Sequence, residues 1–539
     1  MPLLAQFARI AALAAALLAS VPATPAQHEV HGPAPGDPVP EEILERPVPL
    51  RQGIGVVHEK ITTSSADAQA FYDQGVAYLN SFEWIEAARS FHQALRADAN
   101  CAMAHLGLSD AYMGLLQLPE ARTEFEAAQS LADSVSPRER SRITIRAKQL
   151  DYLADGGNLQ KYFAYRQAIT DAIRATPADP WLWILRGFAD EGSPYARGQG
   201  GGADTIAFYQ AAITHAPDNF AAHHYLAHTY ENLGLVDLAL EQDEIYVKAA
   251  PMVPHAHHMV GHDLRRAGRT EEAVEEFLKA EELENAYYRA ENIPAKYDWH
   301  HAHNLTLLAM CYESLGEDKL AEAAYREAFA LPANVDLAEF NRKAWPEFLL
   351  SEGRAQEALA AAGELIQSSF PLGRFAGYTV AGEAQLALNH PGEAHDSLTK
   401  AEEESEHIAA NLIATLPNAG KLRAEILLRE GRQAGGDAVM KQIEQRIEAV
   451  PGPDAWSAAL FELESIAQVA RQAGDWELAE STAKLMIQHD PTYAGGHLEL
   501  ALAARHRGDS ASASAEFSAA QKLWSHADPE VQRRVSNSD

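Results

Sequence analysis

Hydrophobic and polar positions follow a helical period along nearly the whole chain after residue 62. Alanine and leucine recur at helical spacing, and the alternation of apolar and polar residues that marks β-strands is absent. Proline and glycine interrupt this pattern only at scattered points. The first 61 residues differ, because an apolar run from about Ile10 to Val21 is followed there by a proline-rich stretch. The pattern predicts an all-α protein behind a separate N-terminal segment.

The helical pattern is itself repeated, with a period of 34 residues. Six positions in each copy combine large and small side chains. In the first two copies they are Phe71, Gly75, Tyr78, Ala87, Phe91 and Ala94, then His105, Ser109, Tyr112, Ala121, Phe125 and Ala128. Later copies include Tyr230, Gly234, Ala239 and Tyr246, then Gly261, Gly268, Ala273 and Phe277. Such a unit buries its apolar face only by stacking on its neighbours, which predicts a solenoid.

This spacing resembles the tetratricopeptide repeat family, in which two antiparallel helices interlock through large residues set against small ones. The resemblance implies an all-α, right-handed superhelical solenoid, and the recurring register predicts about twelve hairpins. It also implies that the first helix of each hairpin lines a concave groove, with its second, fifth, ninth and twelfth residues facing inward. We expect six segments: a signal peptide (1–26), a proline-rich extended arm (27–61), N-terminal repeats (62–217), central histidine-rich repeats (218–336), C-terminal repeats (337–527) and a tail (528–539).

The net charge limits the classes of partner that the protein can bind, and the N-terminal segment indicates its cellular compartment. The chain has 44 basic and 76 acidic residues, and its net charge of −32 argues against nucleic acid or an anionic membrane surface as the main partner. The apolar run in residues 1–26 is shorter than the ~20 residues that a spanning helix needs. We interpret it as a signal peptide, with an uncleaved anchor as the alternative. A periplasmic or secreted protein without a transmembrane span after cleavage is therefore expected.

The chain has only two cysteines, Cys101 and Cys311, although export favours disulfides. They lie in distant repeats. We therefore expect two buried thiols, with a disulfide between them as the alternative.

Histidines are concentrated in the central repeats, where ten of the 23 fall between residues 223 and 303. Successive first helices carry them at matching groove positions, with His300 and His303 on a third helix. The candidate ligands are His224, His228, His255, His258, His262, His300 and His303. Two histidines spaced i, i+4 aim their imidazoles at one point, and neighbouring helices ~8–10 Å apart can bring further imidazoles to it. The clustering predicts a metal site.

The residue types bear on which metal binds and what it does. Imidazole suits zinc, copper, nickel or iron, and Met259 and Met310 nearby shift the preference slightly toward copper, so copper or zinc is expected. Glu231 on the same face could complete the site as a ligand or act as a general base on a metal-bound water. His223 and His257 fall at the fourth repeat position, which packs into the core in this family. We expect those two to be hydrogen-bonded rather than metal-bound.

In an alternative interpretation, the groove binds a ligand without a metal. Arg265 and Arg266 form a locally basic wall, flanked by Glu231 and Glu313, which suits a carboxylate-bearing peptide or a small anion. A glycine-rich insertion at residues 193–205 is either a lid at the groove edge or a tolerated surface loop. The sequence has no phosphate-binding loop, nucleophile elbow, HExxH or CxxC motif.

The motifs AHHYLAHTYE and PHAHHMVGH are similar to those of exported bacterial tetratricopeptide repeat proteins, a resemblance that implies no particular reaction. The sequence therefore predicts an exported binding or assembly protein whose groove holds a protein segment, with a histidine-ligated transition metal at its centre. Two alternatives stay open. One is a metal-dependent enzyme with Glu231 as general base, and the other is a metal-free interaction scaffold.

Overall fold

A computed structural model describes residues 38–155, 158–192, 195–333, 336–413, 416–448 and 459–536 of the chain. Most of these residues are helical, and no strand occurs among them, which confirms the all-α prediction. The predicted signal peptide, residues 1–26, lies outside the described residues.

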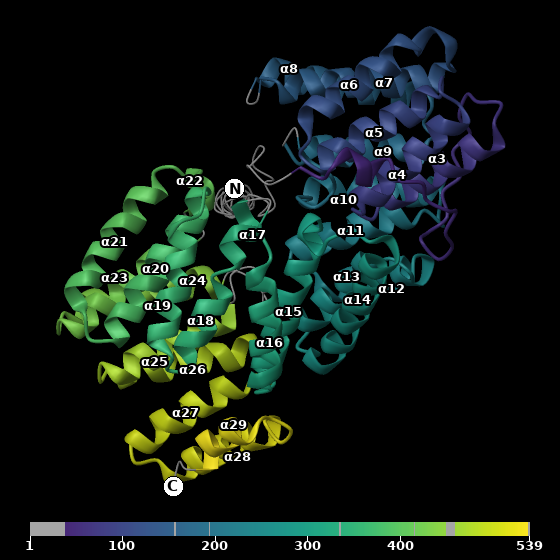
Figure 1. The fold of residues 1–539 in the computed structure, drawn as a ribbon. Coiled ribbons are helices and arrows are strands. Elements are labelled where there is room, and N and C mark those ends of the chain that lie inside the picture. The colour runs from purple at the N-terminus through teal and green to yellow at the C-terminus, as the bar shows by residue number, and fades with distance from the viewer. Residues whose placement is uncertain are drawn as a thin grey trace, which may run out of the picture.

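Successive helices pair into hairpins that stack in chain order (Figure 1). The described residues contain twelve such pairs, in agreement with the repeat count. The pairs are α3 (Ala66–Leu79) with α4 (Trp84–Ala97), α5 (Ala102–Gly114) with α6 (Leu118–Ser130), α7 (Pro137–Leu153) with α8 (Leu159–Ala175), α9 (Pro180–Asp190) with α10 (Ala203–His215), α11 (Phe220–Asn232) with α12 (Val236–Ala249), α13 (Pro254–Arg266) with α14 (Thr270–Glu291), α15 (Trp299–Ser314) with α16 (Asp318–Ala330), α18 (Ala344–Ser351) with α19 (Ala355–Ile366), α20 (Pro371–Ala387) with α21 (Pro391–Ser405), α23 (Asn418–Arg429) with α24 (Gln433–Glu448), α25 (Ala459–Gln472) with α26 (Trp476–His489), and α27 (Ala494–His506) with α28 (Ser510–Leu523). The short helices outside the pairs are α2 (Glu41–Leu44), η1 (Ala132–Ser134), η2 (Ala295–Tyr297), α17 (Asp336–Asn341), α22 (Ala410–Ile413) and α29 (Pro529–Ser536).

In several hairpins an aromatic ring of one helix lies against a glycine of its partner. Phe91 is fully buried, and a Cβ added at Gly75 would lie 2.6 Å from its ring. Phe277 and Gly261 make the same contact in the sixth hairpin, where the separation would be 2.9 Å. Both distances are shorter than a van der Waals contact, so only glycine lets the helices approach this closely.

The turns inside most hairpins share one backbone conformation. The residue two positions before the second helix has a positive φ, and it is usually glycine, as at Gly234 (71°) and Gly268 (72°). Phe82 (59°) and Leu116 (60°) occupy the same place in the first two hairpins. A left-handed backbone costs a residue with a Cβ roughly 1–2 kcal/mol. These two turns therefore keep a large side chain at a cost in stability.

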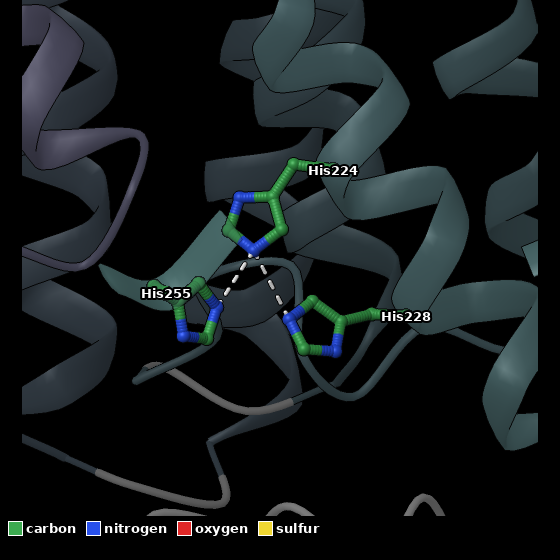
Figure 2. Close-up of side chains that lie close together, drawn as sticks. All are labelled: His224, His228 and His255. Carbon is green, nitrogen blue, oxygen red and sulfur yellow. Dashed lines mark hydrogen bonds between the residues drawn. The ribbon is translucent and has the colours of Figure 1, made fainter. Parts of the chain in front are cut away.

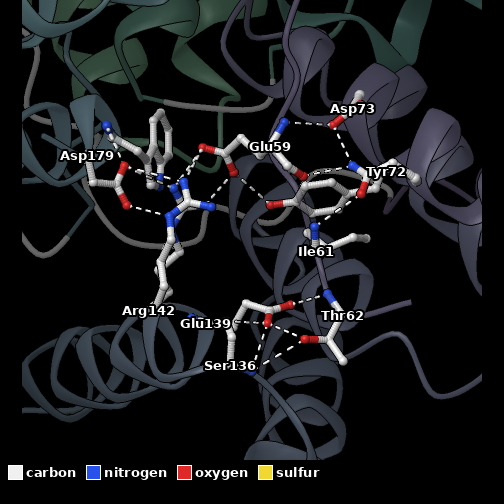
Figure 3. A network of polar contacts seen from close by, with 12 residues as sticks. Glu59, Ile61, Thr62, Tyr72, Asp73, Ser136, Glu139, Arg142 and Asp179 are labelled. Carbon is white, nitrogen blue, oxygen red and sulfur yellow. Dashed lines mark hydrogen bonds and ion pairs between the residues drawn. The ribbon is translucent and has the colours of Figure 1, made fainter. Parts of the chain in front are cut away.

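Residues 38–61 run along the first hairpins as an extended arm, apart from helix α2. Leu44 is fully buried in the same apolar cluster as α3–α6. The far end of the arm is held by a polar network (Figure 3), in which Glu59 lies 2.7 Å from the Arg142 guanidinium and 3.1 Å from the Tyr72 hydroxyl. The described part of the arm is thus packed into the fold.

The solenoid folds back onto its central hairpins from both sides. On the N-terminal side, the carbonyl of Asn80 at the end of α3 lies 2.7 Å from His224 Nδ1 on α11. On the C-terminal side, the Asp528 amide donates to the Gly316 carbonyl at 2.9 Å. Figure 1 shows two halves, purple to teal and green to yellow, with α15 and α16 where they meet. The central hairpins therefore contribute a wall to both halves.

The described part of the glycine-rich insertion packs against α11. The Asn232 side chain donates to the carbonyls of Gln199 and Gly201, at 2.8 and 3.1 Å. A Cβ at Gly201 would overlap Thr229, so the close approach requires glycine. The described part of the insertion is therefore packed on the fold and is not an exposed surface loop. It supports the helix that carries His224 and His228.

Cys101 and Cys311 are buried free thiols, as predicted. Burial raises the pKa of the Cys101 thiol to about 11. Among the helices of the described residues, none is both long and apolar enough to cross a membrane.

Candidate metal centre

Three histidines from two neighbouring helices direct their Nε2 atoms to one place (Figure 2). His224 and His228 lie one turn apart on α11, and His255 lies in the first turn of α13. His224 Nε2 is 3.1 Å from His228 Nε2 and 3.0 Å from His255 Nε2. Nitrogens bound to one tetrahedral zinc ion at ~2.0–2.1 Å stand about 3.3 Å apart. Small movements of the rings would therefore admit a metal ion.

The protein fixes the opposite side of two of these rings. His224 Nδ1 faces the Asn80 carbonyl, so this nitrogen carries the proton and Nε2 keeps its lone pair. His228 Nδ1 faces Glu231 Oε2 at 3.5 Å. A carbonyl or carboxylate behind an imidazole sets its tautomer and raises its basicity as a metal ligand. Both contacts therefore suit metal binding at Nε2.

Burial keeps the imidazoles of this group in the form that binds metal. Burial, reinforced by the His228 imidazole, holds the pKa of His224 well below its usual value. Burial and the surrounding histidines do the same to the pKa of His255. Neutral imidazole is the metal-binding form, so these two ligands need not lose a proton near neutral pH.

The turn between α3 and α4 covers the three imidazoles. The centroid of the Phe82 ring lies 4.8 Å from that of His224, 5.1 Å from that of His255 and 5.9 Å from that of His228. Phe82 has the positive φ that glycine supplies in most other hairpins. The strained backbone thus places an aromatic ring over the converging nitrogens, where it keeps water out.

A second group of ligand-type side chains lies beside the first. Glu231 Oε1 is 2.6 Å from His262 Nδ1 and 3.5 Å from the Arg266 guanidinium. Ligand atoms of Glu231, His262 and Asp263 all lie within 4.8 Å of one another. Because the other oxygen of Glu231 faces His228, this carboxylate connects the two groups.

The electrostatics of Glu231 are set by its neighbours. Burial alone would raise the pKa of this carboxyl group, but the His262 imidazole, followed by His228 and Arg266, holds the pKa well below its usual value. Glu231 is therefore ionised and a weak base. Its Oε2 atom orients His228 through Nδ1, and its Oε1 atom lies against His262 Nδ1.

The other predicted ligands extend the first group into a continuous array of rings. The His258 ring centroid is 5.7 Å from that of His255, 4.4 Å from that of His300 and 4.9 Å from that of His303. Within the described residues, the groupings of three or more possible ligand atoms include none of His258, His300 and His303. His258 Nδ1 instead faces Asn304 at 3.1 Å, and His300 Nδ1 faces Glu284 at 2.6 Å.

Histidines at the fourth repeat position are hydrogen-bonded in the way that their position predicts. His223 Nδ1 faces Gln242 at 2.7 Å, and His257 Nδ1 faces Glu276 at 2.7 Å. In each case Nε2 faces a backbone carbonyl, that of Pro217 for His223, at 3.1 Å. Both ring nitrogens are occupied, so these residues tie the helices of a hairpin together.

The methionines that favoured copper lie in the core. Met259 and Met310 are 1 % and 3 % exposed and belong to apolar clusters. The reason for preferring copper over zinc therefore disappears.

The predicted basic wall does not form. Arg266 turns to Glu231, donating to its backbone carbonyl at 2.8 Å, whereas Arg265 lies against the Cys311 thiol. Glu313 lines a different cavity of about 200 Å³, which lies between α15, α18, α25 and the C-terminal helices. Arg266 thus faces the histidine cluster, whereas Arg265 acts on Tyr325 and Tyr493, which line the same cavity as Glu313.

The groove positions of α11 and α13 are buried instead of open. His224, His255 and His262 are at most 4 % exposed. The fold-back of the α3–α4 turn fills this part of the concave face, which the repeat pattern could not show. A protein segment cannot lie directly over the histidines.

Four residues of this region were missed by the sequence analysis: Asn80, Phe82, Asp243 and Asp263. Asn80 and Phe82 reach the site only through the fold-back, so no local pattern marks them. Asp243 and Asp263 carried a usable signal. Asp243 lies on the same face of its helix as Ala239 and Tyr246, which are fully buried, and a carboxylate at a core position of a repeat is unusual.

Replacing Glu313 by Gln should stabilise the metal-free protein in a pH-dependent way. Burial raises the pKa of Glu313 to about 8, with the Glu464 carboxylate adding to the shift. The folded state therefore holds this proton more tightly than the unfolded state, and stability is lost as pH rises from about 4.5 to 8. The variant should melt several degrees above the wild type at pH 9 and at the same temperature near pH 4.5. Thermal melts in EDTA measure this, with Glu275→Gln at an exposed site as the control. A difference independent of pH would contradict the assignment.

Comparison with known proteins supports the repeat assignment. The profile of the tetratricopeptide repeat family matches residues 302–334. The curated proteins contain no match. Among solved structures, a tetratricopeptide repeat protein from Parabacteroides merdae is 16 % identical, covering 49 % of this chain and 93 % of its own, with a TM-score of 0.35. YrrB, a tetratricopeptide repeat protein with an unusual peptide-binding site, is 18 % identical over 38 % of this chain and 96 % of its own (TM-score 0.26). Yeast Tom70 is 13 % identical over 87 % of this chain and 94 % of its own (TM-score 0.32).

The family profile falls on α15 and α16, one of the twelve pairs in the described residues. The same large-against-small packing joins the helices of other pairs, as at Phe91 and Gly75. Residues 302–334 therefore match a tetratricopeptide repeat, within an all-helical array of hairpins that share its packing.

Proposed function

We propose that this chain is an exported binding or assembly protein that holds one transition-metal ion, zinc or copper, at His224, His228 and His255. The convergence of three buried Nε2 atoms, with spacings of 3.0 and 3.1 Å, carries the proposal. Two of the ligands lie on α11 and one on α13, so the ion cross-links neighbouring hairpins beneath the α3–α4 turn. In this role the metal stabilises the closed N-terminal half of the solenoid.

The contacts of Glu231 favour a structural ion over a catalytic one. Glu231 faces the Nδ1 side of His228, away from the converging Nε2 atoms, and its pKa is held low. A general base for a metal-bound water needs to reach that water and to accept its proton near neutral pH. Glu231 serves better as the group that orients His228.

The proposal assigns the protein segment to the C-terminal half, because the histidine-lined face is closed. The cavity of about 200 Å³ there is lined by carboxylates that include Glu313, Glu383 and Glu464, with Lys421, Arg429 and Arg534 as the basic side chains. Burial raises the pKa of Glu383 to about 8 despite the nearby Lys421 ammonium, and a cationic side chain entering the cavity would favour its ionised form. An excess of buried acidic groups favours a segment with lysine or arginine side chains. A Lys-rich peptide should bind with an affinity that falls in Glu383→Gln, and equal binding of an acidic peptide would refute this assignment.

Elemental analysis tests the metal part of the proposal. Untagged protein purified from its native host without chelators should contain about one zinc or copper ion per chain. A content below about a tenth of an ion per chain, unchanged after incubation with zinc and gel filtration, would leave only the metal-free scaffold.

Replacing Phe82 by Ala should speed the release of the metal. The ring shields the three imidazoles, and its removal costs about 3–5 kcal/mol of packing. Alanine keeps the ~1–2 kcal/mol strain of a left-handed residue, which only glycine would relieve. We expect zinc transfer to excess EDTA to become on the order of tenfold to a hundredfold faster. Leu116→Ala is the matched control, because Leu116 has the same turn position and a φ of 60° in the next hairpin. Equal rates in both variants would show that Phe82 does not gate the site.

A further inference from the structure

Two buried aspartates lie behind the second group of ligand-type side chains. Asp243 of α12 and Asp263 of α13 are both fully buried. In the part of the chain that the structure describes, none of their four carboxylate oxygens accepts a hydrogen bond from a donor group. Carboxylates buried in this way need compensation by a proton or a cation. The pair therefore marks a place where a positive charge is required.

The surroundings of the pair supply a set of ligand atoms from three helices. Asp263 lies with Glu231 of α11 and His262 of α13, and atoms of the three are within 4.8 Å of one another. The Asp243 carboxyl group lies against that of Asp263. Glu231 Oε1 is 2.6 Å from His262 Nδ1. Ligand atoms in one octahedral shell at ~2.0–2.1 Å lie about 3 Å apart, so these side chains are already close to a common centre.

The charges of this group do not balance. Three carboxylates, Glu231, Asp243 and Asp263, are buried together, and the Arg266 guanidinium beside Glu231 provides one compensating positive charge. Burial raises the pKa of both Asp243 and Asp263 well above its usual value, so the pair retains protons when no cation is bound. When all three carboxylates are ionised, two negative charges remain, which is the charge that one divalent cation neutralises. The same cation would give Asp263 the partner that its oxygens lack.

We propose that Glu231, His262 and Asp263, with Asp243 beside them, form a second metal site for a divalent cation of the manganese or iron class. One imidazole nitrogen among carboxylate oxygens is a harder ligand set than the three nitrogens of the first site, and it suits Mn²⁺ or Fe²⁺. The sites are separate, because His228 directs Nε2 to the first and Nδ1 to Glu231. This inference does not depend on the proposed function, since its ligands exclude His224 and His255.

Manganese binding measured by electron paramagnetic resonance tests the second site. Metal-free protein and protein carrying one zinc ion per chain are each titrated with Mn²⁺, and free Mn²⁺ is read from its six-line signal. The expected result is one bound Mn²⁺ per chain. In Asp243→Asn and in Asp263→Asn the bound Mn²⁺ should fall by at least tenfold at the same free concentration, while the zinc content stays at one. Asp237→Asn, at an exposed position of α12, is the matched control.

The same experiment separates this inference from the first site. His255→Gln should lose zinc and keep Mn²⁺ binding, and the aspartate variants should do the reverse. Because an Asn side chain removes a buried charge, both aspartate variants should remain folded, and a thermal melt with and without Mn²⁺ checks this. The proposal is overturned if Mn²⁺ leaves the melting temperature of the wild-type protein unchanged and all added Mn²⁺ stays free in the titration. The two aspartates would then share a proton. Undiminished binding in Asp263→Asn would overturn it as well.

Discussion

His255→Gln should lower the affinity for zinc by at least about 100-fold. Losing a hydrogen-bond partner behind a ligand already weakens metal binding about 10–100-fold, so losing one of three direct ligands should cost at least as much. His255 is the one ligand on α13, and its Nε2 is 3.0 Å from that of His224. Without it, α11 retains only an i, i+4 pair. Competition with a chromophoric chelator measures the change in dissociation constant.

His257→Gln is the matched control for this prediction. It lies two residues away on the same helix, but its ring nitrogens face Glu276 and the Pro251 carbonyl. Its zinc affinity should stay within about threefold of the wild type, a difference of less than ~0.7 kcal/mol. If His255→Gln binds zinc as tightly as His257→Gln does, the three histidines are not the ligands.

Arg89→Met should release the first hairpin from the fold. Arg89 is fully buried, forms ion pairs with Glu86 and with Glu291 at 2.7 Å, and donates to the Pro47 carbonyl at 2.9 Å. Removing one partner from a buried ion-pair network leaves the others uncompensated, at a cost of about 3–5 kcal/mol. This corresponds to amide hydrogen exchange in α3 and α4 that is roughly a hundredfold to several thousandfold faster. Hydrogen exchange with mass spectrometry reads this region separately from the other repeats.

Arg269→Met provides the comparison, because its partner Glu272 is three residues away and both side chains are about half exposed. An exposed pair of this kind contributes ~0–1 kcal/mol, so exchange should hardly change.

The α3–α4 turn carries Asn80 and Phe82 over the imidazoles, so Arg89→Met should also accelerate zinc release. Unchanged exchange in α3 and α4 would show that the ion-pair network does not hold the hairpin.

The repeat architecture could be predicted because its cause is local. The contact between Phe91 and Gly75 depends on a large residue meeting a small one at fixed spacing, and this pattern is visible in the chain. The i, i+4 spacing likewise placed His224 and His228 on one face of α11. The hydrogen-bonded role of His223 and His257 followed from their repeat position in the same way.

The composition of the site depends on contacts that no local pattern records. Which of seven candidate imidazoles converge is decided by side-chain rotamers and by the angle between α11 and α13, so His255 joined His224 and His228 while His258 did not. Phe82 and Asn80 reach the site because the first hairpin folds back across more than a hundred residues of sequence. The same fold-back closed a face that the repeat pattern predicted to be an open groove.

Zinc K-edge X-ray absorption of protein loaded with one equivalent of zinc tests the central claim most directly. We expect a first shell with three imidazole nitrogens at about 2.0–2.1 Å, recognised by the outer-shell scattering of the rings, and loss of one imidazole in His255→Gln. A first shell of oxygen atoms alone, or a spectrum that His255→Gln leaves unchanged, would contradict it.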